Sequence, residues 1–226
     1  MNIGMYLHDA PADNFWDRLG FALEQGFSTF YMSPARVLPG FETADAPTRL
    51  DGHLAEQVRC ALELTGLSCT AMGCACDPSA PDAEAVYRAH FRLARRIWTA
   101  VCPEADQDAV IRMLPRLAAW ASEEGATLTV RLPANTKALP DLPTGVDVIL
   151  DAGTTVPNAD LRRRLEGRVR AIRLPASDVL KGSAALVPLF RLAGSNGLPL
   201  LLSDVTGANA DAVRRWIEGT RTGMSA

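Results

Sequence analysis

Segments with the character of buried strands alternate with segments of helical periodicity along most of this chain of 226 residues. In the segment 14–25, for example, Phe15, Leu19 and Leu23 recur at helical spacing and would share one face. Strands that alternate with helices predict a parallel sheet with right-handed crossovers. Eight such strands in a chain of this length favour a single (β/α)8 TIM barrel over residues 1–226, rather than an open doubly wound sheet.

The apolar segments set the expected boundaries of each element. The expected strands are 2–7, 27–32, 67–72, 97–101, 127–132, 146–150, 169–174 and 199–203. The expected helices are 14–25, 53–64, 83–95, 106–124, 184–193 and 209–218. The segment 134–145 is too short for a full crossover helix, and 159–165 predicts only a short one. The longest irregular stretch, 33–51, is a candidate lid.

The composition is that of a globular protein, with 48% hydrophobic and 22% charged residues. A net charge of −3 provides no broad basic field, so we expect neither nucleic acid nor an anionic membrane as a partner. The N-terminal segment enters a strand pattern at once and lacks the features of a secretion signal. Five cysteines without a regular framework favour reduced thiols and a cytoplasmic location. The sequence leaves the oligomeric state open.

The string Arg-Leu-Pro-Ala occurs at the ends of two predicted strands, beginning at Arg131 and again at Arg173. The strand between them ends in Asp151. Side chains alternate along a strand, and this phase directs all three side chains into the barrel at the carboxyl ends of the strands, where these barrels hold their active sites. A closed ion-pair network that plugs the barrel is one interpretation. The alternative, which we favour, is that both arginines also bind an anionic small-molecule substrate.

Three further regions carry candidate site residues. His8 shares the inward phase of the first strand and could act as a general base oriented by Asp9, or could only hydrogen-bond at the rim. The loops after the seventh and eighth strands often bind substrate phosphate in this architecture, and they offer Asp178, Lys181, Ser203 and Asp204. Helix capping and a turn would account for these two loops without a ligand.

The clustered cysteines Cys69, Cys74 and Cys76 follow the third strand. No second pair completes a zinc ribbon, and buried small thiols are the simpler interpretation than a soft-metal site.

Five short segments give the chain a resemblance to a known family. They open the first strand, lead into the second, third and fifth, and end the sixth: 2–5, 23–27, 64–67, 121–125 and 148–153. With these segments the chain resembles the xylose isomerase-like TIM barrels, which include sugar phosphate isomerases and epimerases. The resemblance implies a divalent metal held at the barrel mouth by Glu, Asp, His and Glu.

This chain departs from that ligand set at most positions. Arg131 stands where the resemblance implies a Glu, Arg173 where it implies a His, and Ser203 where it implies the last Glu. Asp151 is kept, and Asp178 is a candidate displaced acid. A guanidinium cannot ligate a metal but is a permanent cation. We therefore expect no metal and no other cofactor, with the two arginines supplying the positive charge instead.

The resemblance and the charged cluster together give an expected function. We expect a metal-independent enzyme similar to sugar phosphate isomerases and epimerases, which acts on a small oxygenated anion by proton transfer next to a carbonyl. Asp151 or His8 would be the base, and the arginines would stabilise the negative oxygen. The alternative is a non-catalytic ligand-binding or scaffold protein that kept the barrel and lost the reaction.

Overall fold

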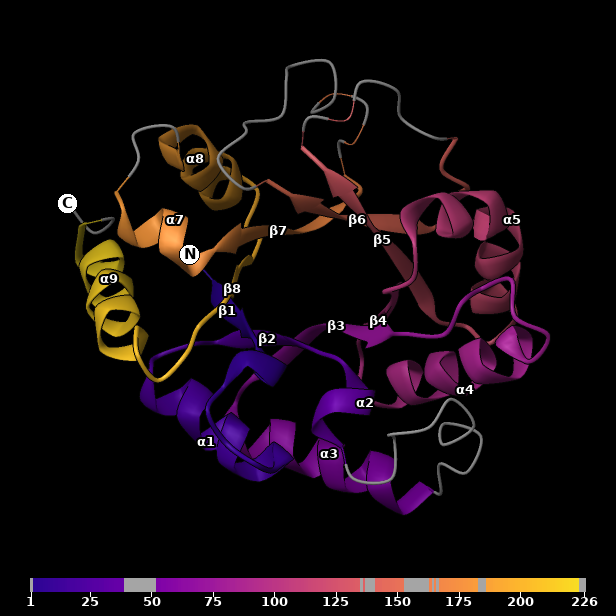
Figure 1. Cartoon of the computed structure of the whole chain (residues 1–226), viewed down its shortest axis with the longest axis horizontal. Coiled ribbons are helices and arrows are strands. Elements are labelled where there is room, and N and C mark those ends of the chain that lie inside the picture. Colours follow the sequence, from indigo (N-terminus) through magenta and orange to yellow (C-terminus); the bar gives the residue numbers. More distant parts are fainter. Residues whose placement is uncertain are drawn as a thin grey trace.

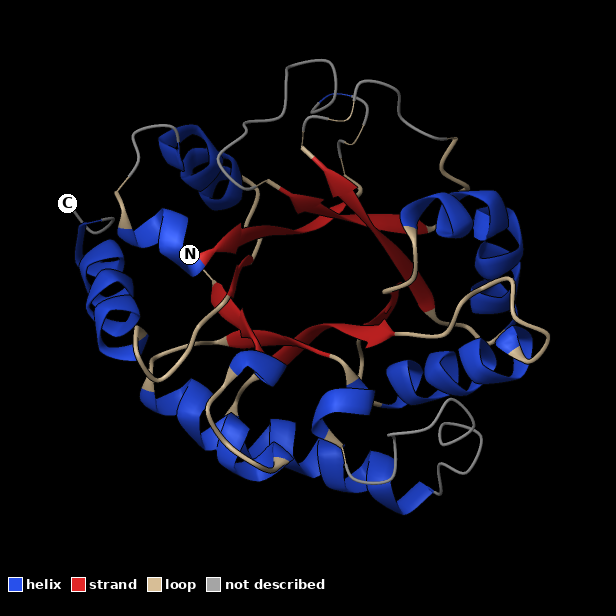
Figure 2. Cartoon of the chain, in the orientation of Figure 1, coloured by secondary structure: helices blue, strands red, loops and turns tan. Residues whose placement is uncertain are grey.

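A computed structural model describes residues 2–38, 52–134, 136, 141–152, 163, 165, 167–182 and 186–223. Within these residues, parallel strands close into a barrel in the order β1 to β8, each pairing with its neighbours in sequence. The helices lie outside the ring of strands (Figures 1 and 2). The predicted (β/α)8 TIM barrel is confirmed.

The elements have the following bounds. The strands are β1 (Ile3–Tyr6), β2 (Thr29–Met32), β3 (Ser68–Cys74), β4 (Ala100–Pro103), β5 (Thr127–Pro133), β6 (Val146–Asp151), β7 (Val169–Pro175) and β8 (Leu200–Ser203). The helices are η1 (Leu7–Asp9, a 3-10 turn), α1 (Phe15–Glu24), α2 (Pro34–Val37), α3 (Gly52–Thr65), α4 (Ala83–Arg96), α5 (Gln107–Glu123), α7 (Ala176–Leu180), α8 (Val187–Ser195) and α9 (Ala210–Gly223).

Most elements lie where the sequence predicts them, and the differences have local causes. Two short helices, α2 and α7, occupy stretches expected to be loops; Pro34 starts the first and Pro175 precedes the second, and proline has the backbone angle of a helix start. The fourth strand begins three residues later than expected, because α4 ends before Trp98, which takes a left-handed conformation. The predicted helix 159–165 and most of the candidate lid lie outside the described residues.

The apolar residues form two layers. The larger layer fills the space between the strands and the helices. The smaller layer fills the barrel itself, and consists of Tyr6, Tyr31, Ala71, Ala100, Cys102, Ile149, Ala171 and Leu201. Gly4 belongs to the inward phase too, and a Cβ there would lie 2.6 Å from the Thr29 carbonyl oxygen, so only glycine fits. The lumen is therefore filled by a packed core.

An arginine closes the floor of the barrel. Simple alternation would place Arg170 on the outer face with Ile172, but the pairing of β6 with β7 shifts register and makes Arg170 an extra residue. A similar shift makes Thr70 an extra residue in β3, on the opposite side of the barrel. Arg170 Nε donates to the Thr70 carbonyl at 2.7 Å, and its Nη1 lies 3.2 Å from Asp147 Oδ2. The two bulges are thus joined across the lumen.

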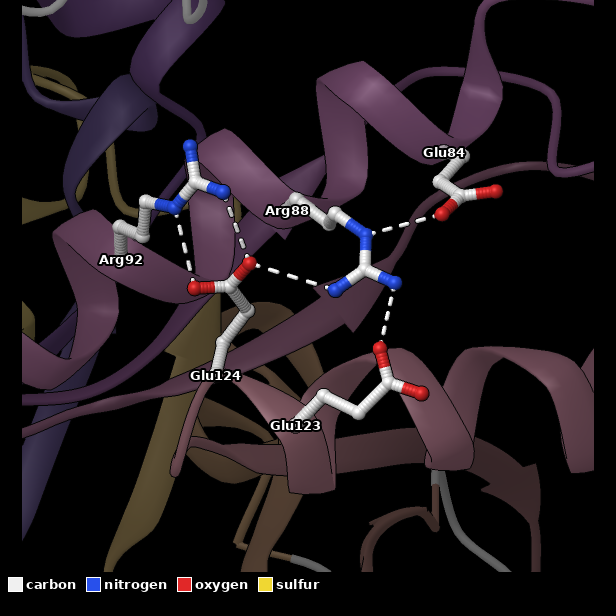
Figure 3. A network of polar contacts seen from close by, with 5 residues as sticks. All are labelled: Glu84, Arg88, Arg92, Glu123 and Glu124. Atoms are coloured by element: carbon white, nitrogen blue, oxygen red, sulfur yellow. Dashed lines mark hydrogen bonds and ion pairs between the residues drawn. The ribbon is translucent and has the colours of Figure 1, made fainter.

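An ion-pair network joins two helices of the outer layer (Figure 3). Arg88 of α4 contacts Glu84 on its own helix at 2.9 Å, Glu123 at the end of α5, and Glu124 just beyond it at 3.3 Å. Arg92 adds a second contact to Glu124 at 2.9 Å. Three of these five side chains are largely solvent-exposed, and the other two, Arg88 and Glu124, are partly buried, so each pair contributes up to about 1 kcal/mol to stability.

Two further findings concern the cysteines and the length of the helices. Cys69 and Cys74 are buried free thiols, as expected, and Cys76 is half-buried. Within the described part of the chain, no helix has both the length and the apolar character that crossing a bilayer requires.

Candidate active site at the barrel mouth

A cavity of about 370 Å³ opens at the carboxyl ends of the strands. Of the residues singled out from the sequence, it brings together His8, Arg131, Arg173, Ser203 and Asp204, with Asp9 beside them. The structure adds four polar side chains that the sequence did not single out as site residues: Tyr6, Ser33, Arg36 and Glu104.

The predicted Arg, Asp and Arg cluster forms at this mouth. Arg131 Nη2 donates to Asp151 Oδ2 at 2.7 Å, and Arg173 Nη1 donates to both carboxylate oxygens at 2.9 and 2.8 Å. Asp151 and Arg173 are register partners on the adjacent strands β6 and β7, and this pairing places the Arg173 guanidinium beside the Asp151 carboxylate. Both arginines also line the cavity, with 36% and 23% of their side chains exposed. The ion-pair network therefore exists, but it does not withdraw the guanidiniums from the cavity.

Two stacked tyrosines lie next to the arginines, and one of them, Tyr6, lines the cavity. The rings of Tyr6 and Tyr31 stack with centroids 4.5 Å apart, and the Arg173 guanidinium lies 5.2 Å from the Tyr6 ring centroid. Burial raises the pKa of the Tyr6 phenol well above its ordinary value, so this hydroxyl stays protonated. Each arginine uses one terminal nitrogen for Asp151, and within the described residues its other terminal nitrogen has no hydrogen-bond partner. Those remaining donors can serve a ligand.

His8 lies in the 3-10 turn η1, not at the end of the first strand as the sequence suggested. Arg18 holds this turn, since its Nη1 donates to the carbonyls of Leu7, His8 and Ala10 at 3.3, 2.7 and 3.1 Å. In the turn, His8 and Asp9 both reach the cavity, which strand alternation would have prevented, and His8 Nε2 lies 3.7 Å from Asp9 Oδ1.

Burial lowers the pKa of His8 below its ordinary 6.5, and the nearby Arg36 and Arg18 lower it further, whereas Asp9 and Glu104 act in the opposite direction. His8 is therefore a neutral imidazole at neutral pH, which is the form that can accept a proton.

The residues of the last two loops divide into two groups. Ser203 is buried at the end of β8 and its hydroxyl lies 3.4 Å from the carboxylate of Asp204. The Asp204 N–H donates to Asp9 Oδ2 at 2.8 Å, which ties the end of β8 to η1. Asp178 and Lys181 pair with each other at 3.5 Å on and just after α7, and are not among the described residues that line the cavity. Their substrate-binding role stays a prediction.

Glu104 is the main site residue that the sequence analysis missed. It follows β4, and it accepts hydrogen bonds from the Tyr31 hydroxyl on Oε1 and the Ser33 hydroxyl on Oε2, both at 2.9 Å. The predicted fourth strand stopped at residue 101, but β4 runs to Pro103. Read to that end, the sequence would have placed a glutamate at the carboxyl end of a strand, where catalytic groups of this fold lie.

A second cavity of about 210 Å³ lies beside the first. Glu104 and Arg131 line both cavities, whereas Asp151 and Gln107 line only the second among the described residues. The site therefore has two lobes, which meet at the Glu104 carboxylate and the Arg131 guanidinium.

A divalent metal, which the resemblance implies, does not fit these residues. The guanidiniums of Arg131 and Arg173 lie against Asp151, the one ligand of the implied set that is kept, and would repel a cation. Among the described residues, no three His, Cys, Asp or Glu side chains are grouped so that they could hold a metal ion. Arg131 and Arg173 place positive charge at this mouth.

Of the comparisons with known proteins, the comparison of structures supports the fold. No family model and no curated protein matches the sequence. The structure is similar to the probable 3-DHS dehydratase AsbF of Bacillus anthracis, with a TM-score of 0.66 and 12% identity over 96% of this chain and 98% of that one. It is also similar to a xylose isomerase domain protein of Alicyclobacillus acidocaldarius, with a TM-score of 0.65 and 14% identity over 97% of each chain.

A third similar structure is a sugar phosphate isomerase/epimerase of Parabacteroides distasonis, with a TM-score of 0.60 and 11% identity over 91% of this chain and 89% of that one. Identities this low establish the fold and not the activity. The chain has the fold of the xylose isomerase-like TIM barrels, as its sequence segments predicted.

Proposed function

We propose that this protein is a metal-independent enzyme that acts on a small oxygenated anion, a sugar acid or a sugar phosphate, by proton transfer next to a carbonyl. One observation carries the proposal: a neutral imidazole and two guanidiniums line the same cavity. The names of the similar structures, an isomerase/epimerase and a dehydratase, support the general class of reaction.

In the proposed reaction His8 removes the proton from the carbon beside the carbonyl. The electron pair of the broken C–H bond moves to the carbonyl oxygen, where Arg131 and Arg173 stabilise the negative charge. We assign the base to His8 rather than Asp151, because the Asp151 oxygens already accept three hydrogen bonds from the arginines. Asp151 then acts as the residue that positions both guanidiniums.

The same cluster favours a substrate with a single negative charge. Two guanidiniums and one carboxylate leave a net charge of +1 at the cluster. A carboxylate or an enolate matches this charge better than a phosphate dianion does, so sugar acids are the first compounds to test.

The test is solvent deuterium exchange. Hexuronic acids, 2-ketoaldonic acids and ketose phosphates are incubated with the protein in D2O, and deuterium at the carbon beside the carbonyl is followed by NMR. We expect exchange with the wild type, and a loss of about 10²- to 10³-fold in rate for Arg131→Ala, the effect of removing one oxyanion donor. Binding of these compounds without exchange in the wild type would instead identify the barrel as a non-catalytic binding protein.

A further inference from the structure

Glu104 has a rigidly defined place in the cavity. Its two oxygens are held by different hydroxyls, that of Tyr31 on β2 and that of Ser33 just after it. The carboxylate also occupies the space over Gly73, where a Cβ would come within 2.4 Å of Glu104 Cδ and Oε1. Two neighbouring strands, β2 with the residue that follows it and β3, therefore hold the carboxylate in one orientation.

The electrostatic environment of Glu104 is unlike that of Asp151. Among the described residues, no lysine or arginine lies within ion-pair distance of Glu104, whereas Asp151 contacts two arginines. A carboxylate has about four acceptor positions, and the Tyr31 and Ser33 hydroxyls use two of those of Glu104. Two carboxylates in one site with such different partners are suited to different tasks, one to fixed charge and one to proton transfer.

Glu104 lies where the two lobes of the site meet. It lines both lobes of the site together with Arg131, so a ligand that extends from one lobe to the other passes beside it. His8 lines the larger lobe and comes from the turn after β1, whereas Glu104 follows β4. Two groups able to move protons thus face one cavity from segments that follow different strands.

Building on the function proposed above, we propose that Glu104 moves a hydroxyl proton while His8 moves a carbon-bound proton, which makes the substrate an anionic α-hydroxy aldehyde or ketone and the reaction an isomerisation. His8 takes the proton from the hydroxyl-bearing carbon, and the electron pair forms the double bond of an enediolate whose negative oxygen lies against the arginines. The Glu104 carboxylate takes the proton of the neighbouring hydroxyl and delivers it to that negative oxygen. The His8 imidazolium returns its proton to the former carbonyl carbon, so carbonyl and hydroxyl have exchanged places and both residues are regenerated.

The two proton transfers are measured separately in one experiment. Hexuronic acids are incubated in D2O with wild type, Glu104→Gln and His8→Asn; NMR follows deuterium at carbon, and chromatography follows the isomeric keto acid. We expect Glu104→Gln to lose isomer formation by at least about 100-fold, within the usual contribution of general acid–base catalysis, and deuterium exchange by no more than about 10-fold. His8→Asn should lose both.

Two controls keep the result interpretable. A 2-keto-3-deoxyaldonic acid has no hydroxyl on the carbon beside its carbonyl, so Glu104→Gln should slow its exchange far less than it slows hexuronate isomerisation. Tyr31→Phe removes one hydrogen bond to Glu104 and should slow isomer formation alone, by about 10-fold. If Glu104→Gln forms the isomer at the wild-type rate, or loses exchange as completely as isomer formation, the role of Glu104 is wrong while the proposed function stands. If the wild type exchanges no compound, the proposed function itself fails.

Discussion

Removing the Asp151 carboxylate tests whether the arginine pair is held for anion binding. In Asp151→Ala, three charge-assisted hydrogen bonds of 2.7 to 2.9 Å disappear and two guanidiniums are left side by side. Bonds of this kind contribute about 1.5–3 kcal/mol each when fully buried. Here a quarter to a third of each side chain is exposed, so water replaces part of the loss. We expect the free energy of unfolding to fall by about 3 kcal/mol, the lower end of the range for a broken buried ion pair.

The distinguishing result is rescue by an anion. Two uncompensated guanidiniums facing a cavity should bind inorganic phosphate. If the Kd is about 10 mM, about 100 mM phosphate would raise the free energy of unfolding of Asp151→Ala by about 1.4 kcal/mol. Urea unfolding with and without phosphate, at constant ionic strength, measures this quantity.

Asp147→Ala is the matched control, because Asp147 pairs with Arg170 at the floor through a single contact of 3.2 Å. We expect Asp147→Ala to lower the free energy of unfolding by no more than about 1 kcal/mol, and phosphate not to restore the loss. Equal costs for the two variants, or no rescue in Asp151→Ala, would refute the view that the cluster at the mouth is a built anion site.

Three further outcomes are expected. Burial lowers the pKa of His8 in the folded protein, so the unfolded chain binds more protons as the pH falls below 6.5. The wild type should therefore lose stability relative to His8→Asn below that pH, and not above about pH 7. Urea unfolding across a pH series will measure this difference. Protein purified without chelator should contain far less than one divalent metal per chain by elemental analysis, and a chelator should leave its exchange activity unchanged. Glu124→Gln should lower the free energy of unfolding by about 1 kcal/mol at low salt and by less at high salt, because its contacts to Arg88 and Arg92 are only partly buried.

The charged cluster could be predicted from the sequence because it depends on two regular features of a parallel barrel. Side chains alternate along β5, and along β7 beyond its bulge at Arg170, so the phase of Arg131 and Arg173 follows from the apolar residues beside them. The carboxyl ends of neighbouring strands also meet at one rim, which brings Asp151 between the arginines. Neither feature needs information from distant parts of the chain.

The residues that escaped prediction depend on irregular or long-range features. Glu104 was hidden by an error of two residues in the end of one strand, since strand ends carry no sharp sequence signal. Arg170 enters the lumen only because a bulge interrupts the alternation, and its partner Thr70 is about a hundred residues away. His8 reaches the cavity through a 3-10 turn whose carbonyls are held by Arg18, a contact that no local pattern announces.

The two ends of the lumen show why the mouth, and not the floor, can carry chemistry. Each end has an arginine–aspartate ion pair, and an apolar layer that includes Ile149 and Leu201 separates the two ends. At the floor, Arg170 donates its Nη1 to Asp147 and its Nε to the Thr70 carbonyl, so the backbone of a distant strand takes part in the pair. At the mouth, both guanidiniums keep terminal nitrogens without a partner among the described residues, and they face a cavity that also holds His8 and Glu104. We therefore expect the ion pair at the floor to be structural, and the one at the mouth to be available to a substrate because a cavity and a neutral base lie beside it.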